Sequence, residues 1–347
     1  MRRLPIYFLI DVSESMVGAP IEEVQQGMRT IIQNLRVDPY ALETVYVSII
    51  AFAGKAKVLS PLTELYKFYP PVLPIGGGTS LGAAMDCLMN DMDRSVKRTT
   101  MEEKGDWKPI IFLFTDGNPT DEYAAAFRRW NDRYRRHCSL VAISIGDNVN
   151  VLTLAQLTDD ILLLKDTDAE SFSQFFKWVT ASIKTSSMSV SEQSSDGVKL
   201  APTTGINLEK VDPRTHPATV DENFAVLHGR CQNTRQDYLV KYGRERYAAG
   251  GMREYDPSGF RLVGAYPIDR ESYASLSGNE KAHINTRMLT GVPACPCCGN
   301  QLGVVVCECG NVFCVGQSPT NECPWCGMEG TLGEGGPGGM DITRALG

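Results

Sequence analysis

Apolar runs and amphipathic stretches alternate from residue 4 to about residue 185, and this order constrains the fold more than any other feature of the chain. Leu4–Val12 and Pro109–Thr115 are almost continuous apolar runs, which is typical of strands buried on both faces. Between them, Pro20–Leu35 places its apolar residues at a helical spacing. The N-terminal half is therefore predicted to be α/β, with a doubly wound, mostly parallel sheet that helices cover on both faces.

Further elements of the same kind complete this half. The predicted strands are Val45–Phe52, Lys55–Leu59, Ser139–Ile145 and Ile161–Leu164, and the predicted helices are Leu81–Met92, Thr120–Arg136 and Ala169–Ile183.

The composition changes after this half. Seven of the 16 residues from Ser182 to Gly197 are serine, and seven of the 13 from Gly327 to Gly339 are glycine. Short β-type runs lie between these stretches, at Phe224–Cys231, Asp237–Tyr242 and Gly259–Tyr266. We therefore divide the chain into an α/β domain at 1–185, a serine-rich linker at 186–205, a β-rich module at 206–330 and a flexible glycine-rich tail at 331–347.

The charge balance counts against some classes of function. Asp and Glu number 41 against 34 Lys and Arg, for a formal net charge of −7. This balance counts against general nucleic-acid binding, which depends on neutralising phosphates, and against binding to a membrane surface. No apolar run approaches the ~18 residues that span a bilayer. The first residues loosely resemble a secretion signal, but no small-residue cleavage site follows, so we expect a cytoplasmic protein.

Polar side chains stand at the ends of three of the predicted elements. Asp11, Ser13 and Ser15 come at the end of the first strand, Thr79 precedes the helix that begins at Leu81, and Asp116 follows the strand Pro109–Thr115. In a doubly wound sheet such loops meet beyond the carboxyl ends of the strands. Two carboxylates and several hydroxyls suit a hard ion such as Mg²⁺ or Mn²⁺ that keeps waters and one open position.

With these motifs, residues 4–185 resemble the von Willebrand factor A (VWA) family, whose metal-ion-dependent adhesion site uses the pattern D-x-S-x-S. The resemblance implies that Ser13, Ser15 and Thr79 touch the metal through hydroxyls, and that Asp11 and Asp116 bind it directly or through water. It also implies that a partner protein supplies an Asp or Glu as the sixth ligand. The expected ion is Mg²⁺, with Mn²⁺ or Ca²⁺ as alternatives.

The same loops permit an enzymatic alternative. Residues 78–82 read G-x-S-x-G, the nucleophile motif of α/β-hydrolases, with Ser80 in its centre. That motif requires a strand that runs directly into it, and the preceding residues 70–77 are interrupted by proline. His137 is the one histidine of this domain, and its place at the end of a predicted helix favours a capping role.

Cysteine use is uneven, because eight of the 11 cysteines lie within the 32 residues from Cys295 to Cys326. Cys295/Cys298 and Cys323/Cys326 each read C-P-x-C-G, a turn that directs two thiolates to one ion. A cluster of this kind in a cytosolic chain indicates zinc rather than disulfides. Cys87, Cys138 and Cys231 are scattered and are interpreted as structural thiols.

The sequence leaves the pairing of the ligands open. One zinc ribbon could use Cys295, Cys298, Cys323 and Cys326, which leaves Cys307, Cys309 and Cys314 for a second ion that lacks a fourth ligand. Alternatively, the first knuckle pairs with Cys307 and Cys309. Cys297 fits neither arrangement, and one or two Zn²⁺ ions are expected. Between Cys295 and Cys326 there is no Lys or Arg, which counts against a nucleic-acid-binding ribbon.

The whole order of segments, including residues 238–242 and 264–268, resembles the bacterial TerY family of tellurite-resistance-associated VWA proteins. The resemblance implies a stress-response phosphorylation module, with a Ser/Thr kinase, a PP2C-type phosphatase or another Ter protein as partner. The leading interpretation is a non-enzymatic, metal-dependent interaction or scaffold protein. The alternatives are a hydrolase that uses Ser80 and a zinc-ribbon regulator that binds nucleic acid.

Overall fold

The computed structural model describes residues 2–116, 118–145, 151–164, 169–191, 201–202, 208–210, 224–249, 252–278, 282–318, 320–331 and 339–345. The chain divides into two compact units. The first comprises Met1–Val12, Ala19–Leu73 and Thr79–Val220, and the second comprises Ser13–Gly18, Pro74–Gly78 and Asp221–Gly347. Two short segments of the N-terminal half therefore belong to the second unit.

The first unit is built on a seven-stranded sheet in the order β3-β2-β1-β4-β5-β6-β7. Its strands are β1 (Leu4–Asp11), β2 (Val45–Phe52), β3 (Ala56–Glu64), β4 (Ile110–Thr115), β5 (Ser139–Ile145), β6 (Asp160–Leu164) and β7 (Leu208–Lys210). The five central strands run parallel, and the two edge strands β3 and β7 are antiparallel to their neighbours. The predicted doubly wound, mostly parallel sheet is confirmed.

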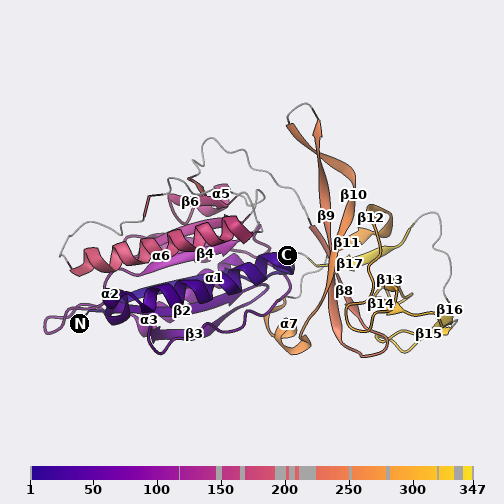
Figure 1. Ribbon diagram of the computed structural model, residues 1–347, viewed down its shortest axis with the longest axis horizontal. Coiled ribbons are helices and arrows are strands. Elements are labelled where there is room, and N and C mark those ends of the chain that lie inside the picture. Colours follow the sequence, from indigo (N-terminus) through magenta and orange to yellow (C-terminus); the bar gives the residue numbers. More distant parts are fainter. Residues whose placement is uncertain are drawn as a thin grey trace. The chain divides into compact units, whose positions relative to one another are not determined.

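Helices cover both faces of this sheet. They are α1 (Ala19–Arg36), α2 (Pro39–Thr44), α3 (Leu81–Ser95), α4 (Ala124–Arg133), α5 (Val151–Ala155) and α6 (Ala169–Ser191). One core joins Tyr7 and Leu9 of β1 to α3, α4 and α5. On the other face α1 and α6 lie side by side (Figure 1), and Phe114 of β4 packs against Phe175 of α6. A Cβ at Gly27 of α1 would overlap the Phe176 ring, so this glycine lets the two helices approach closely.

Several element boundaries differ from those predicted. The helix predicted at 120–136 is confined to α4 (Ala124–Arg133), because Asp121 binds the amino end of α3 through Gly82 N and Ala83 N, at 3.2 and 3.0 Å. Helix α6 continues to Ser191, past residue 186 where the linker was predicted to begin. Most of the rest of that linker, at 192–200 and 203–205, lies outside the described residues.

The second unit is rich in β-structure, as predicted. Its main sheet has the order β12-β10-β9-β8-β14-β13, and β11 pairs with β17 and β15 with β16 in two small sheets. The bounds are β8 (Phe224–Arg230), β9 (Asp237–Ala249), β10 (Met252–Pro267), β11 (Ala282–Asn285), β12 (Leu289–Thr290), β13 (Leu302–Val306), β14 (Val312–Val315), β15 (Thr320–Glu322), β16 (Glu329–Thr331) and β17 (Asp341–Arg344). Two short helical elements, α7 (Arg270–Leu276) and η2 (Thr286–Met288), connect some of these strands, and η1 (Glu14–Met16) belongs to this unit as well.

The end of the chain corrects one prediction. A flexible tail was predicted at 331–347, yet Asp341–Arg344 form β17 and pair antiparallel with β11. Ile342 is 1% exposed and packs into the core of the second unit, together with Ile284 of β11. Glycine content alone hides this strand, because its buried residue lies only three residues after the glycine-rich stretch.

No helix in the described part of the chain is both long and apolar enough to cross a bilayer.

Candidate metal centres

Two of the predicted oxygen ligands lie at the ends of neighbouring strands of the first sheet. Asp11 is the last residue of β1, and Asp116 comes directly after β4, the parallel neighbour of β1. Thr115 donates a hydrogen bond from Oγ1 to Asp11 Oδ2 at 2.7 Å, and this bond fixes the buried carboxylate at the carboxyl edge of the sheet. The order of the strands therefore places both carboxylates at the same edge.

Thr79 belongs to the same edge. Its backbone N–H donates to Thr120 Oγ1 at 3.0 Å, and the N–H of Thr120 donates to Thr79 O at 2.8 Å. These bonds tie the loop before α3 to the loop after β4. Thr79 is 1% exposed, and its Oγ1 has no hydrogen-bond partner in the described part of the chain. A buried hydroxyl left in this way costs about 1–3 kcal/mol, which a metal ion bound at Oγ1 would offset.

The two serines follow Asp11 in the chain at spacings of two and four residues. Ser13 and Ser15 flank Glu14 at the start of the short 3-10 helix η1, and both serines are buried. Their hydroxyl oxygens lie 3.0 Å apart. The donor set of hydroxyls and carboxylates thus fits a hard divalent ion, and the unpaired Thr79 hydroxyl fits it as well.

Ser80 does not have the surroundings of a nucleophile. It precedes α3, and its hydroxyl donates to the carbonyl oxygen of Gly54 at 3.0 Å. His137 lies two residues before β5, at the opposite edge of the sheet from the loop that contains Ser80. A serine nucleophile needs a base within hydrogen-bond reach, so this arrangement does not favour the hydrolase alternative.

Eight thiols of the second unit form two separate clusters. In the first, which we call cluster 1, the sulfur atoms of Cys231, Cys295, Cys298 and Cys314 all lie within 4.8 Å of one another. In cluster 2 the same holds for Cys307, Cys309, Cys323 and Cys326. Each cluster offers the four thiols of a tetrahedral structural zinc site.

This grouping differs from both arrangements considered from the sequence. The knuckles Cys295/Cys298 and Cys323/Cys326 do not share a site, and Cys307/Cys309 joins the last knuckle rather than the first. All seven predicted ligands lie in a cluster, and Cys231, interpreted above as a structural thiol, completes cluster 1. Cys297 belongs to neither cluster and packs against the core of the second unit.

Strand pairing explains why the sequence did not predict Cys231 as a metal ligand. β8 runs parallel to β14, with Arg230 opposite Phe313, so that the next residues, Cys231 and Cys314, lie side by side. Their sulfur atoms are 3.8 Å apart. No local spacing could indicate this pair, because 82 residues separate the two cysteines in the chain.

Three glycines give the knuckles a common backbone shape. Gly299, Gly310 and Gly327 have φ angles of 77°, 81° and 76°. Each donates its N–H to the carbonyl oxygen of the cysteine that begins its turn, at 2.8–2.9 Å. Nothing lies within 4 Å of a Cβ built at these positions, so the backbone conformation and not space requires glycine.

The thiols differ in acidity. Burial raises the pKa of Cys295 and that of Cys307 to about 12. Burial alone would also raise the pKa of Cys309, but hydrogen bonds from Asn311 lower it to about 7. Because thiolates are the form that binds metal, ion binding must displace protons from the buried members of each cluster.

Two family models match the chain. The von Willebrand factor type A domain matches residues 6–178, and the TerY-C metal binding domain matches residues 221–347. Solved structures show more distant similarity. They include a von Willebrand factor type A protein from Catenulispora acidiphila, with 13% identity, a TM-score of 0.41, and 82% of this chain and 61% of that chain covered.

The ArnB paralog VWA2 from Sulfolobus acidocaldarius is also 13% identical, with a TM-score of 0.38 and coverage of 79% of this chain and 69% of that chain. Proximal thread matrix protein 1 from the mussel byssus is 17% identical, with a TM-score of 0.39 over 52% of this chain. The match spans 48% of the mussel protein, about half its length. From the two family models, the chain has the TerY-type architecture, a von Willebrand factor type A domain followed by a TerY-C metal binding domain.

Proposed function

We propose that this protein is a non-enzymatic scaffold that captures a partner protein through a metal ion held by Asp11, Ser13, Ser15, Thr79 and Asp116. The ion is Mg²⁺, with Mn²⁺ or Ca²⁺ as alternatives. Only two of the five side chains carry a charge, so a divalent ion bound there retains affinity for a further carboxylate. An Asp or Glu of the partner supplies that carboxylate as the sixth ligand.

The observation that supports this proposal most directly is the Thr79 hydroxyl. It is buried at the edge where the loops after β1 and β4 begin, and it lacks a hydrogen-bond partner within the described residues. A polar atom in that position is costly unless something binds it. The neighbouring donors are carboxylate and hydroxyl oxygens, which are the ligands that Mg²⁺ prefers.

Clusters 1 and 2 each hold one Zn²⁺ in this proposal. Four thiols within 4.8 Å of one another suit a closed tetrahedral site, and such a site leaves no open position for a substrate. The two ions therefore stabilise the second unit rather than catalyse a reaction. The eleven cysteines, all within the described part of the chain, form no disulfide, which agrees with a reducing, cytoplasmic location.

The partner belongs to a stress-response phosphorylation module linked to tellurite resistance. A Ser/Thr kinase, a PP2C-type phosphatase or another Ter protein is the expected binding protein. The support for this part of the proposal is the TerY-type architecture alone.

Affinity capture from the native host tests the metal-dependent contact. The bait is the full chain in buffer with Mg²⁺, compared with Asp116→Ala, which removes one ligand at the sheet edge. Asp132→Ala is the matched control, because it removes an exposed carboxylate from α4. We expect wild type and the control to retain the same partner and Asp116→Ala to lose it. Equal capture by Asp116→Ala would contradict the proposal.

A further inference from the structure

A pocket of about 800 Å³ lies at the edge of the first sheet opposite to Asp11 and Asp116. Pro109 and Cys138, which directly precede β4 and β5, line it, whereas Asp116 directly follows β4. Residues at the carboxyl ends of α3 and α4 form its walls. The pocket is therefore separate from the candidate metal site, and the proposed function does not use it.

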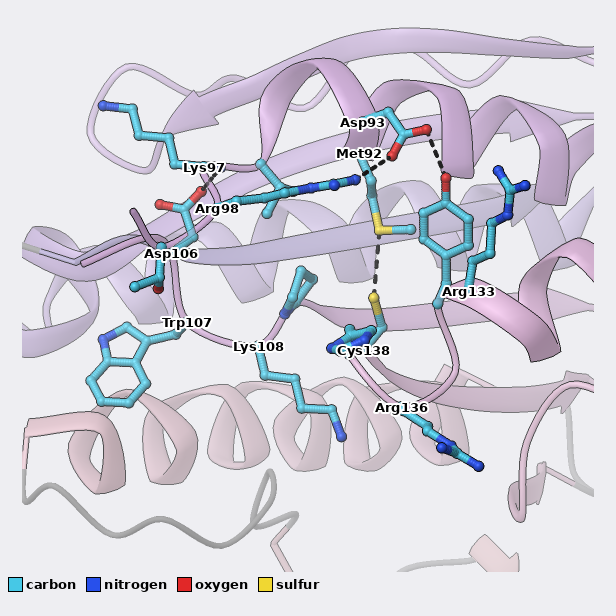
Figure 2. Close-up of a pocket in the computed structure, with 15 residues that line it drawn as sticks. Met92, Asp93, Lys97, Arg98, Asp106, Trp107, Lys108, Arg133, Arg136 and Cys138 are labelled. Atoms are coloured by element: carbon cyan, nitrogen blue, oxygen red, sulfur yellow. Dashed lines mark hydrogen bonds and ion pairs between the residues drawn. The ribbon is translucent and has the colours of Figure 1, made fainter. Parts of the chain in front are cut away.

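The floor of the pocket is apolar. Met92 and Cys138 are 4% and 6% exposed, and their sulfur atoms face each other at 3.8 Å in the middle of the pocket (Figure 2). Burial raises the pKa of the Cys138 thiol to about 12, so this group is neutral and unreactive. Trp107 and Tyr134 line the pocket as well. A floor of this kind suits an apolar side chain of a ligand.

Cations surround this floor. Figure 2 shows Arg98 on one side of the two sulfur atoms and Lys108 and Arg136 on the other. The complete set of exposed lysines and arginines that line the pocket is Lys97, Arg98, Lys108, Arg133 and Arg136. Five cations around one pocket stand out in a chain whose formal net charge is −7.

The two carboxylates of the pocket are already paired. Asp106 accepts hydrogen bonds from Arg3 Nε at 2.8 Å and from the backbone N–H of Lys97 at 2.8 Å. Asp93 accepts from Tyr134 Oη at 2.7 Å and from Arg98 at 3.3 Å. Neither carboxylate is therefore available to neutralise the other cations of the pocket.

Four of the five cations thus remain without an ion-pair partner among the described residues, namely Lys97, Lys108, Arg133 and Arg136. Cations are favourable at the ends of helices, which accounts for Arg133 at the end of α4. Lys108 precedes a strand, so no helix dipole explains its place. The excess positive charge therefore indicates an anionic ligand.

We propose that this pocket binds an acidic peptide segment of a partner protein, with an apolar side chain on the floor and carboxylates at the surrounding cations. A phosphate ligand would concentrate its charge at one point, and proteins commonly hold such groups with the backbone N–H groups of helix N-termini. Here the helices present their carboxyl ends, and the cations are spread around the pocket. Separate carboxylates on a peptide match that distribution.

Panning a displayed peptide library on the full chain tests the proposal. We expect recovered peptides to carry Asp or Glu on both sides of an apolar residue. The affinity of one such labelled peptide should fall about fivefold or more in Lys108→Gln/Arg136→Gln, and it should fall with added salt, because exposed charge pairs are worth about two- to fivefold each and are screened. Lys108→Arg should bind as wild type does.

Two control variants test whether the loss of affinity is specific to this pocket. Arg29→Gln/Lys177→Gln removes two exposed cations from α1 and α6, and it should leave peptide affinity unchanged. Asp116→Ala should leave it unchanged as well. Equal binding to Lys108→Gln/Arg136→Gln and wild type would overturn the proposal, and so would peptides without acidic residues. Binding of a labelled nucleotide that Lys108→Gln/Arg136→Gln abolishes, with no acidic peptide recovered, would assign the pocket to a phosphate ligand instead.

Discussion

At the scale of single residues, a substitution of Thr79 can distinguish a metal-binding role of its hydroxyl from a structural one. Its hydroxyl is buried without a partner within the described residues, so removal of that hydroxyl should cost the metal-free fold nothing. Thr79→Val should leave the free energy of unfolding unchanged in metal-free protein, or raise it by about 1 kcal/mol. The same variant should bind Mn²⁺ about tenfold or more weakly, as measured by electron paramagnetic resonance.

Thr79→Ser is the matched control, because it retains the hydroxyl and loses only a methyl group. It should bind Mn²⁺ like wild type and unfold slightly more easily. If Thr79→Val destabilises the metal-free protein by several kcal/mol while its Mn²⁺ affinity stays normal, the hydroxyl is structural.

Asp237 is a buried carboxylate of the second unit whose ionisation should stabilise the fold. Burial alone would raise the pKa of this carboxyl, but hydrogen bonds from His228 at 3.1 Å, and from Arg230 and Arg270 at 2.8 Å, lower it overall. A lowered native pKa stabilises the fold at pH values above the unfolded value of about 3.9, and this contribution disappears as the pH falls through the native pKa.

Asp237→Asn should therefore lower the free energy of unfolding by about 1–3 kcal/mol at neutral pH, because charged donors lose their anionic acceptor. Its stability should also depend less on pH than that of wild type below pH ~4. Urea denaturation at several pH values measures both effects. Glu329→Gln, at an exposed position in β16, should match wild type throughout, and parallel pH profiles for Asp237→Asn and wild type would refute the assignment.

At the scale of elements, the parallel pairing of β8 with β14 carries Cys231 to Cys314 and completes cluster 1. If each cluster holds one ion, Cys231→Ser should lower the zinc content from two ions per chain to about one, because a site with three thiolates binds zinc more weakly. Elemental analysis after dialysis against a weak chelator measures the stoichiometry.

Cys297 supplies the control for that measurement. It is adjacent to Cys298 and partly buried, yet it lies in neither cluster. Cys297→Ser should retain two zinc ions per chain. Equal zinc loss in the two variants, or no loss in either, would show that the four thiols of cluster 1 do not act together.

Local patterns predicted the elements of the first sheet well. The bounds of β2 and β5 coincide with the predicted strands, because each is a short, mostly apolar run with a glycine one or two residues beyond its end. β7 was not predicted, since three residues are too few for a periodic pattern and its pairing with β6 supplies the order. β17 was hidden in the same way, because its stability comes from β11. Motif and topology together predicted which residues lie at the carboxyl edge of the first sheet. The grouping of the cysteines could not be predicted in this way, because it depends on which strands pair in the folded chain.

At the scale of the whole molecule, the two units depend on different interactions. The first has a large core on each face of its sheet and contains no cysteine cluster among its described residues. In the second, cysteines of both clusters are themselves part of the buried cores: Cys231, Cys295 and Cys314 in one, and Cys307 and Cys323 in the other. A bound ion would connect the strands through its thiolate ligands. Removal of the metal would therefore take away these links and leave the thiols buried in the cores.

Zinc removal should consequently unfold the second unit and spare the first. Structural zinc sites contribute about 10–16 kcal/mol of apparent binding free energy, more than a small domain has to lose. In calorimetry, 1,10-phenanthroline should abolish or lower one transition of the full chain and leave the other within a few degrees. Zinc binding to the recovered apoprotein should release protons and tighten with rising pH, because zinc binds thiolates and free cysteine thiols are mostly protonated at neutral pH. Thr79→Val, which alters the other metal site, should show the same zinc-dependent transition as wild type. A single transition that phenanthroline leaves in place would mean that the second unit folds without metal, and the eight clustered thiols would then not hold a structural ion.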